Sequence, residues 1–225
     1  MRTQQLSSSL SSDVPGDGPV RVLAIGGSTR PGSSSEKALR IAAEHAAQAG
    51  AEVELITGRE LMLPIYDTEN APRSPEVLRL LAALRRAEAV IISSPGYHGT
   101  MSGMMKNALD YVEDLRQHDR VYLDGLAVGC IAVAYGWQAT VSTLQNLRVA
   151  AHALRGWPTP LGAAINVSSE VFSEDGTSCC DEATQFQLQT VGTQVVEFAL
   201  MRRLMGRSQV GPELVGHRTS AGKAC

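Results

Sequence analysis

The sequence predicts an α/β protein in which five parallel strands form one doubly wound sheet of strand order 2-1-3-4-5. Short aliphatic runs alternate along the chain with longer segments of helical period. The runs are apolar throughout, which is typical of strands covered by helices on both faces. Right-handed crossovers between parallel strands leave few strand orders, and 2-1-3-4-5 is the leading one.

Five segments carry the strand pattern. They are Val20–Ile25, Glu52–Ile56, Ala89–Ser93, Leu126–Ala134 and Ala163–Val167. Ligands of such sheets bind at the carboxyl ends of the strands, beside the point where the strand order reverses. The loops after the first, third and fourth strands are therefore the places to look for a binding site.

Five further segments have helical spacing. They are Glu36–Ala49, Pro75 through Leu84, Ser102–Leu115, Val141–Leu154 and Asp181–Arg203. Gly50 follows the first helix at a position that favours glycine, and Pro75 suits a first helical turn. In the fourth helix, apolar residues spaced by three and four predict one buried stripe, namely Val141, Leu144, Leu147, Ala151 and Leu154.

Both ends of the chain lack the apolar periodicity of the middle. Residues 1–18 are rich in Ser, Asp, Pro and Gly, and residues 207–225 mix Gly, Ser, Pro and charged residues. Neither end can bury enough apolar surface to offset the entropy cost of ordering it. We therefore expect two disordered tails around one domain of residues 19–206.

Charge and cysteine content indicate no macromolecular partner. The formal net charge is −3 and the Lys and Arg residues are scattered, so no nucleic-acid-binding surface is expected. Leu126–Ala134 is too short to cross a bilayer, and residues 1–20 lack the apolar region of a signal peptide. No membrane association is expected. The 4 cysteines show no metal-ligand spacing, which favours free thiols in a cytoplasmic protein. Cys179 and Cys180 are interpreted as an inert loop pair, with a redox role as the alternative.

The first loop, GGSTRPGSSS from Gly26 to Ser35, joins a strand to a helix N-terminus. Unpaired N–H groups and the helix dipole favour an anion there. Hydroxyl groups and the guanidinium of Arg30 suit phosphate oxygens. A capping box, with Ser33 as N-cap and Glu36 three residues later, explains only part of the loop. The pattern favours a phosphate-binding loop.

Two common phosphate motifs are absent from this loop. Ser33 stands where a Walker A loop has its lysine, and no G-x-G-x-x-G pattern follows the strand. A monophosphate is the ligand that remains.

The second loop, SPGYHGT at residues 94–100, precedes the third helix. Its proline stiffens the exit from the strand, and its two glycines allow the backbone to approach a flat ligand. Tyr97 and His98 offer aromatic surface beside that ligand, although a histidine in a loop is more often a bystander. Lys106 and Asp110, four residues apart in the helix, are typical of a surface ion pair.

The third loop, YGWQ at residues 135–138, follows the fourth strand. Its glycine and aromatic residues can line the same pocket. Packing of Trp137 in a subunit interface is the alternative.

Several stretches together resemble the NADPH-dependent FMN reductase family of flavodoxin-like proteins. They are VLAIGGSTRPGS at residues 22–33, LPIY at 63–66, SPGYHG at 94–99 and KNALD at 106–110. The resemblance spans about residues 20–154. It implies a flavodoxin-like three-layer sandwich, FMN as the cofactor, and NADPH or NADH as the electron donor.

The resemblance also implies which residues bind FMN. The phosphate is expected at Ser28, Arg30, Ser33, Ser34 and Ser35, and the isoalloxazine ring between Pro95, Gly96, Tyr97, His98 and Gly99 on one side and Tyr135 and Gly136 on the other. Many members have Gly-Gly where this chain has Gly136-Trp137, and an acidic residue or Val in place of Gly96. We assign no catalytic acid or base, because hydride transfer through a flavin requires none.

Members of this family are usually homodimers or homotetramers built through the helix after the second loop. Met101, Met104 and Met105 fit either such an interface or an ordinary core.

The activity expected from these features is NAD(P)H-dependent FMN reduction. The acceptor of the electrons would be free flavin for a partner monooxygenase, or a quinone or azo compound. A flavodoxin-type electron carrier without its own substrate is the alternative, although such carriers are usually more acidic than a net charge of −3. A phosphate-binding module without flavin is a third interpretation.

Overall fold

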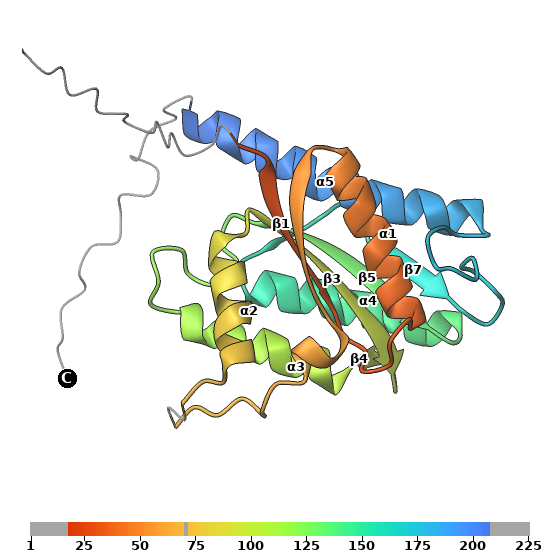
Figure 1. The fold of residues 1–225 in the computed structure, drawn as a ribbon, viewed down its shortest axis with the longest axis horizontal. Coiled ribbons are helices and arrows are strands. Elements are labelled where there is room, and N and C mark those ends of the chain that lie inside the picture. Colours follow the sequence, from red (N-terminus) through yellow and green to blue (C-terminus); the bar gives the residue numbers. More distant parts are fainter. Residues whose placement is uncertain (1–17, 70–71, 208–225) are drawn as a thin grey trace, which may run out of the picture.

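The sheet at the centre of the molecule has the predicted strand order. The computed structural model describes residues 18–69 and 72–207, arranged in three layers (Figure 1). The parallel strands are β2 (Ala51–Thr57), β1 (Val20–Gly26), β3 (Ala89–Tyr97) and β5 (Ala127–Ala134), in that order, with β6 (Trp157–Pro158) and β7 (Ala163–Asn166) both paired to β5. The predicted tails lie outside the described residues, except for Gly18 and Arg207.

The predicted fifth strand is broken into two pieces, β6 and β7. Pro158 and Pro160 lie at the break, and proline has no backbone N–H to donate to a neighbouring strand. A further strand that the sequence did not predict, β4 (Thr100–Met101), pairs antiparallel with the end of β3.

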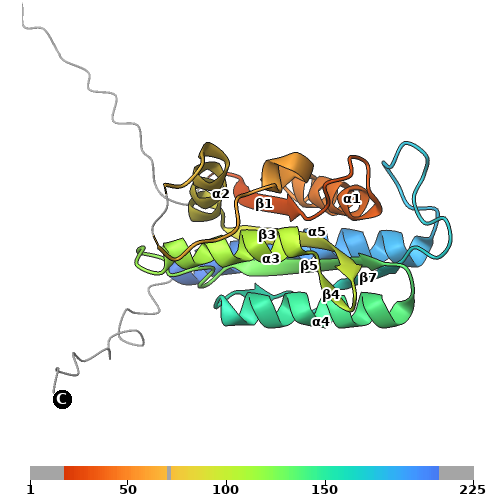
Figure 2. The same ribbon diagram turned by 90° about the horizontal axis from the view of Figure 1, so that it is seen from below.

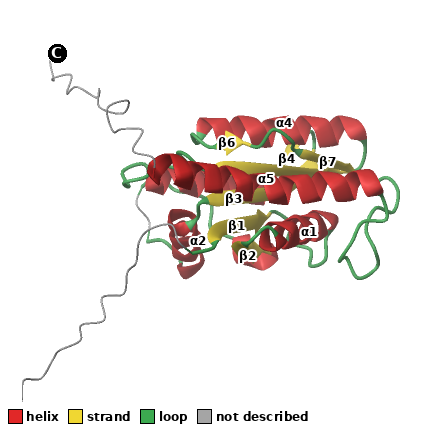
Figure 3. Cartoon of the chain, turned by 90° about the horizontal axis from the view of Figure 1, so that it is seen from above, coloured by secondary structure: helices red, strands yellow, loops and turns green. Residues whose placement is uncertain are grey.

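Helices cover both faces of the sheet. One face carries α1 (Ser34–Gln48) and α5 (Glu182–Arg207) (Figure 3), and the other carries α2 (Pro75–Arg86), α3 (Gly103–Asp110) and α4 (Trp137–Ala153) (Figure 2). Two short 3-10 turns, η1 (Gly58–Leu61) and η2 (Tyr111–Leu115), follow β2 and α3. The predicted third helix is thus a short α-helix continued by a tighter turn. Successive side chains of β1 enter different cores, Val22 the α1–α5 core and Leu23 the opposite one.

The predicted stripe of α4 faces the sheet only in part. Leu147 and Ala151 are buried, whereas Val141 is exposed. The hydroxyl residues Thr140 and Thr143 are fully buried instead. Thr143 lies against β3, where a Cβ added at Gly96 would come within 2.5 Å of its Oγ1.

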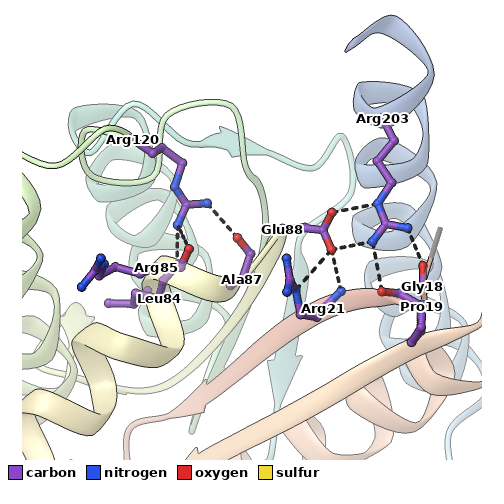
Figure 4. A network of polar contacts seen from close by, with 9 residues as sticks. All are labelled: Gly18, Pro19, Arg21, Leu84, Arg85, Ala87, Glu88, Arg120 and Arg203. Carbon is purple, nitrogen blue, oxygen red and sulfur yellow. Dashed lines mark hydrogen bonds and ion pairs between the residues drawn. The ribbon is translucent and has the colours of Figure 1, made fainter. Parts of the chain in front are cut away.

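Glu88, between α2 and β3, joins three segments at the amino ends of the strands (Figure 4). Its carboxylate accepts hydrogen bonds from Arg203 Nε at 2.7 Å and from the backbone N–H of Arg21 at 3.1 Å. Arg203 also donates to the carbonyl oxygens of Gly18 and Pro19. Burial raises the pKa of Glu88, but the hydrogen bonds from Arg203 and Arg21 outweigh burial and hold the pKa below its ordinary value.

We expect acid to remove the stability that this network contributes. Because the pKa of Glu88 is lower in the folded protein, its contribution is complete above the ordinary pKa of 4.5 and is lost as the pH falls through the folded value. Urea unfolding of the natural protein and of Glu88→Gln measures the effect. The difference between their free energies of unfolding should shrink as the pH falls below about 4.5. A difference that stays constant down to about pH 3 would contradict this account.

Candidate functional site

The loop after β1 leads into the N-terminus of α1. Ser33 is the N-cap, and its Oγ accepts a hydrogen bond from the N–H of Glu36 at 3.3 Å. The carboxylate of Glu36 accepts from the N–H of Gly32 at 3.0 Å, so the predicted capping box is only half formed. No described residue accepts a hydrogen bond from the N–H groups of Ser34 or Ser35. These two donors are free at the helix end, where the dipole favours an anion.

The five residues predicted to bind phosphate differ in burial and in hydrogen bonding. Ser33 and Ser35 are buried, and their hydroxyl oxygens lie 3.2 Å apart within hydrogen-bond distance. The Oγ of Ser28 accepts a hydrogen bond from the N–H of Arg30 at 3.3 Å. The hydroxyl of Ser34 and the exposed guanidinium of Arg30 have no partner among the described residues. The loop from Gly26 to Ser35 contains no acidic side chain. Its free groups are therefore donors, a set that fits a monophosphate.

The loop after β3 forms a tight hairpin with β4. His98 and Gly99 form its turn, with φ of 52° and 83°. Two positive φ angles are those of a type I′ turn, whose twist matches that of the paired strands. Ser142 of α4 donates a hydrogen bond to the carbonyl of Gly99 at 2.8 Å. The side chains of Tyr97 and His98 are exposed at the tip.

Gly96, at the base of this hairpin, is required by packing against α4. A Cβ added at Gly96 would lie 2.5 Å from Thr143 Oγ1 and 3.0 Å from the Cβ of Ala134. The first distance is too short for a real side chain, and the second is tighter than most Cβ contacts. The structure thus accounts for Gly96 without a ligand.

The loop after β5 presents exposed aromatic side chains from a fixed backbone. Gly136 has φ of 101°, and its N–H donates to Asn166 Oδ1 at 2.8 Å. Tyr135 before it is 79% exposed, and Trp137 after it is 61% exposed. Asn166, at the end of β7, was not predicted by the sequence as a site residue.

Three buried serines that the sequence analysis missed, Ser93, Ser94 and Ser102, connect the first and second loops. We call them the serine seam. The Oγ of Ser102 donates to the carbonyl of Gly27 at 3.0 Å, and the N–H of Ser102 donates to Ser94 Oγ at 2.9 Å. The Oγ of Ser93 donates to the carbonyl of Ser35 at 2.7 Å. The sequence does hold a signal for two of them, because Ser93 and Ser94 are hydroxyl residues that follow the buried aliphatic part of β3.

Two of the motif stretches, LPIY at residues 63–66 and KNALD at residues 106–110, are joined by hydrogen bonds. Asn107 of α3 accepts a hydrogen bond from the N–H of Tyr66 and donates one to the carbonyl of Pro64, both at 2.8 Å. The hydroxyl of Tyr111 donates to the same carbonyl at 3.1 Å. Helix α3 therefore holds the segment after β2 as well as the loops after β1 and β3.

The remaining predicted features have structural explanations. Lys106 and Asp110 form an exposed ion pair with 2.5 Å between Nζ and Oδ1, as predicted. Burial raises the pKa of Cys179 to about 11, which keeps the thiol protonated at neutral pH and supports the inert interpretation. Within residues 18–69 and 72–207, no group of His, Cys, Asp and Glu side chains is arranged to hold a metal ion. None of the described helices is long and apolar enough to cross a membrane.

The sequence is similar to those of known oxidoreductases. A family model described as NADPH-dependent FMN reductase matches residues 20–170. The FMN-dependent NADPH-azoreductase of Staphylococcus aureus (strain USA300) is 28% identical over 172 residues, which cover 74% of this chain and 87% of that protein. The NADPH azoreductase of Bacillus sp. (strain OY1-2) is 31% identical over 86 residues, which cover 38% of this chain and 45% of that protein.

The fold is shared with solved flavoenzyme structures. FerB of Paracoccus denitrificans, described as a flavoenzyme NAD(P)H:(acceptor) oxidoreductase, superposes with a TM-score of 0.61 at 24% identity. The match covers 80% of this chain and 97% of that chain. The likeness supports the flavodoxin-like arrangement of sheet and helices predicted from the sequence.

Proposed function

This chain belongs to the NADPH-dependent FMN reductase family, and on that premise we propose that its loops after β1, β3 and β5 hold FMN beside a flat acceptor. It is an oxidoreductase that uses FMN and NADPH. Bound FMN supplies the two-electron chemistry between the nicotinamide donor and the acceptor. The protein contributes binding, orientation and access to the ring.

The free hydrogen-bond donors at the start of α1 support the proposal that the FMN phosphate binds there. The N–H groups of Ser34 and Ser35, the hydroxyl of Ser34 and the guanidinium of Arg30 would hold the phosphate. Ser33 and Ser35 would support it indirectly, because their hydroxyls cap the helix and pair with each other. Ser28 would set the backbone of the loop through its bond to the N–H of Arg30.

We propose that the ring lies between the hairpin after β3 and the loop after β5. Pro95, Gly96, Tyr97, His98 and Gly99 would border one side, and Tyr135 and Gly136 the other. The two walls are held at a fixed spacing by α4, which begins at the second wall and binds the carbonyl of Gly99 in the first. The described residues from 94 to 100 carry no acidic or basic side chain besides His98, which leaves the ring face open to a nicotinamide.

Exposed aromatic residues favour a flat aromatic acceptor. Tyr97, Tyr135 and Trp137 are all more than half exposed, and they come from the two loops that α4 holds together. Aromatic side chains stack on flat rings with offset or edge-on geometry. A quinone, an azo compound or free flavin would therefore suit this surface better than a bulky non-planar acceptor.

Reduction and reoxidation can be measured separately. FMN-loaded protein mixed with NADPH without oxygen should lose its yellow absorbance, and adding a quinone should restore it. With an azo dye the reoxidation is followed as loss of the dye's colour, and with free FMN in excess it is followed as continued oxidation of NADPH. NADH in place of NADPH tests the donor preference. Failure of both donors to bleach the flavin would instead support an electron carrier. A protein that binds no flavin at all would support the phosphate-binding module.

We also propose a cytoplasmic homodimer or homotetramer. Cys130, Cys179 and Cys180 are free thiols, which suits a reducing compartment. Met101 and Met105 are buried in the core, so only Met104 of that cluster remains as an adaptable contact for a partner subunit. The exposed side of α4 offers apolar residues for a second copy, namely Val141 and Val149. A partner monooxygenase would receive reduced flavin only if free FMN is the acceptor.

A further inference from the structure

We propose that Ser102 is a positioning residue that fixes the phosphate loop relative to the ring loop, so that both halves of one FMN molecule are bound at once. The inference rests on the proposed FMN site and adds a role for a residue outside it. Ser102 touches neither loop's free donors. It acts through the backbone of Gly27 in the first loop and the hydroxyl of Ser94 at the start of the second.

The contacts of Ser102 leave it little freedom. Its side chain is 4% exposed and is the N-cap of α3, where Oγ accepts from the N–H of Met105 at 3.1 Å. The same hydroxyl donates its proton to the carbonyl of Gly27 at 3.0 Å. One oxygen thus fixes the start of a helix and the first residue after β1 together.

The first loop approaches α3 closely at this point. A Cβ added at Gly27 would lie 2.9 Å from both Ser102 Oγ and the Cβ of Met105. The N–H of Gly27 donates to the carbonyl of Ser93 at 2.8 Å, so both backbone groups of Gly27 are bonded to the serine seam. The position of the first loop is therefore set by residues that flank the second loop on both sides.

A second tie joins the end of β3 to the start of α1. The hydroxyl of Ser93 donates to the carbonyl of Ser35 in the first turn of α1. Ser35 carries one of the free N–H groups assigned to the phosphate. Loss of either hydrogen bond would leave the phosphate loop and the ring loop intact, but the distance between the two loops would vary more.

The expected result follows from how a two-part ligand binds. When two binding elements are held at the correct spacing, a ligand that reaches both gains from the second contact without a further loss of freedom. Ser102→Ala should therefore weaken FMN about tenfold, which corresponds to about 1.4 kcal/mol. Riboflavin reaches only the ring loop and inorganic phosphate only the phosphate loop, so both affinities should change less than about twofold.

Flavin fluorescence gives the affinities of FMN and riboflavin, and competition with FMN gives that of inorganic phosphate. The matched control is Ser74→Ala, which removes another N-cap serine, on α2, whose hydroxyl accepts from the N–H of Val77 and bonds the carboxylate of Glu76, both in the same helix. Both variants lose a helix cap, but only Ser102→Ala cuts a tie between loops. Ser74→Ala should leave all three affinities unchanged.

Each outcome has one meaning. A selective loss for FMN supports the positioning role. An equal loss for FMN and riboflavin, or no loss for either, overturns it. If Ser102→Ala does not fold, Ser93→Ala cuts the other tie and should give the same selective loss. Failure of the natural protein to bind FMN more tightly than riboflavin would count against the proposed phosphate site itself and not against Ser102.

Discussion

Replacing Arg30 with alanine should lower the affinity for FMN by about 10- to 150-fold and leave the affinity for riboflavin nearly unchanged. Arg30 is the only cationic residue between Gly26 and Ser35, and its guanidinium has no acceptor among the described residues. A charge-assisted hydrogen bond to phosphate contributes roughly 1.5–3 kcal/mol, and about 1.4 kcal/mol corresponds to a factor of ten. Riboflavin lacks the phosphate and cannot make this bond.

The test compares the change in FMN affinity with the change in riboflavin affinity. Fluorescence titration measures both affinities, and inorganic phosphate should weaken in parallel with FMN, unlike in Ser102→Ala. Arg85→Ala is a control of equal charge, because Arg85 is exposed in the last turn of α2 and its side chain points away from the neighbouring network (Figure 4). Equal losses for FMN and riboflavin would place Arg30 near the ring. Changes below about threefold for both would leave the phosphate to hydroxyl and N–H groups.

Gly192→Ala should destabilise the protein by about 2–3 kcal/mol and lower its melting temperature by about 4–12 °C. Gly192 lies where α5 crosses α1, and a Cβ added there would lie 2.3 Å from the carbonyl oxygen of Ala42 and 3.0 Å from the backbone nitrogen of Ala46. Both neighbours are backbone atoms, so the helices must move apart. Alanine gains about 1 kcal/mol of helix propensity over glycine, which offsets only part of this cost.

Gly103→Ala is the matched control, because it makes the same change in another helix. No atom lies within 4 Å of a Cβ added at Gly103, at the exposed start of α3. This variant should be unchanged or more stable by up to about 1 kcal/mol. Urea unfolding compares the two. If Gly192→Ala matched the stability of the natural protein, the close approach of α1 and α5 would be wrong.

The strand order was predictable because it depends on local pattern. Apolar runs such as Val20–Ile25 and the helical spacing that follows each run are properties of short segments, and right-handed connections restrict how they assemble. The break between β6 and β7 depends instead on how each piece pairs with β5, which lies about thirty residues earlier in the chain. A window of sequence around Pro160 does not contain that partner.

The phosphate-binding character of the first loop could also be predicted from the sequence, since hydroxyls, glycines and Arg30 lie close together in the chain. The sequence did not predict which of the hydroxyl groups are free to bind a ligand. Ser33 and Ser35 turn inward, because one caps α1 and the two hydroxyls bond each other, while Ser34 stays available. Adjacent residues of the same type thus receive different roles from the helix that they begin.

The sequence by itself determined the fold class, the family and the order in which the site loops occur, because these follow from periodicity and contiguous motifs. Only the tertiary structure decided how the loops are joined. The bond from Ser102 to Gly27 connects residues 75 positions apart, and the bond from Gly136 to Asn166 connects residues 30 apart. Buried polar groups must find partners wherever the folded chain provides them, and no local pattern records which distant carbonyl or amide that will be.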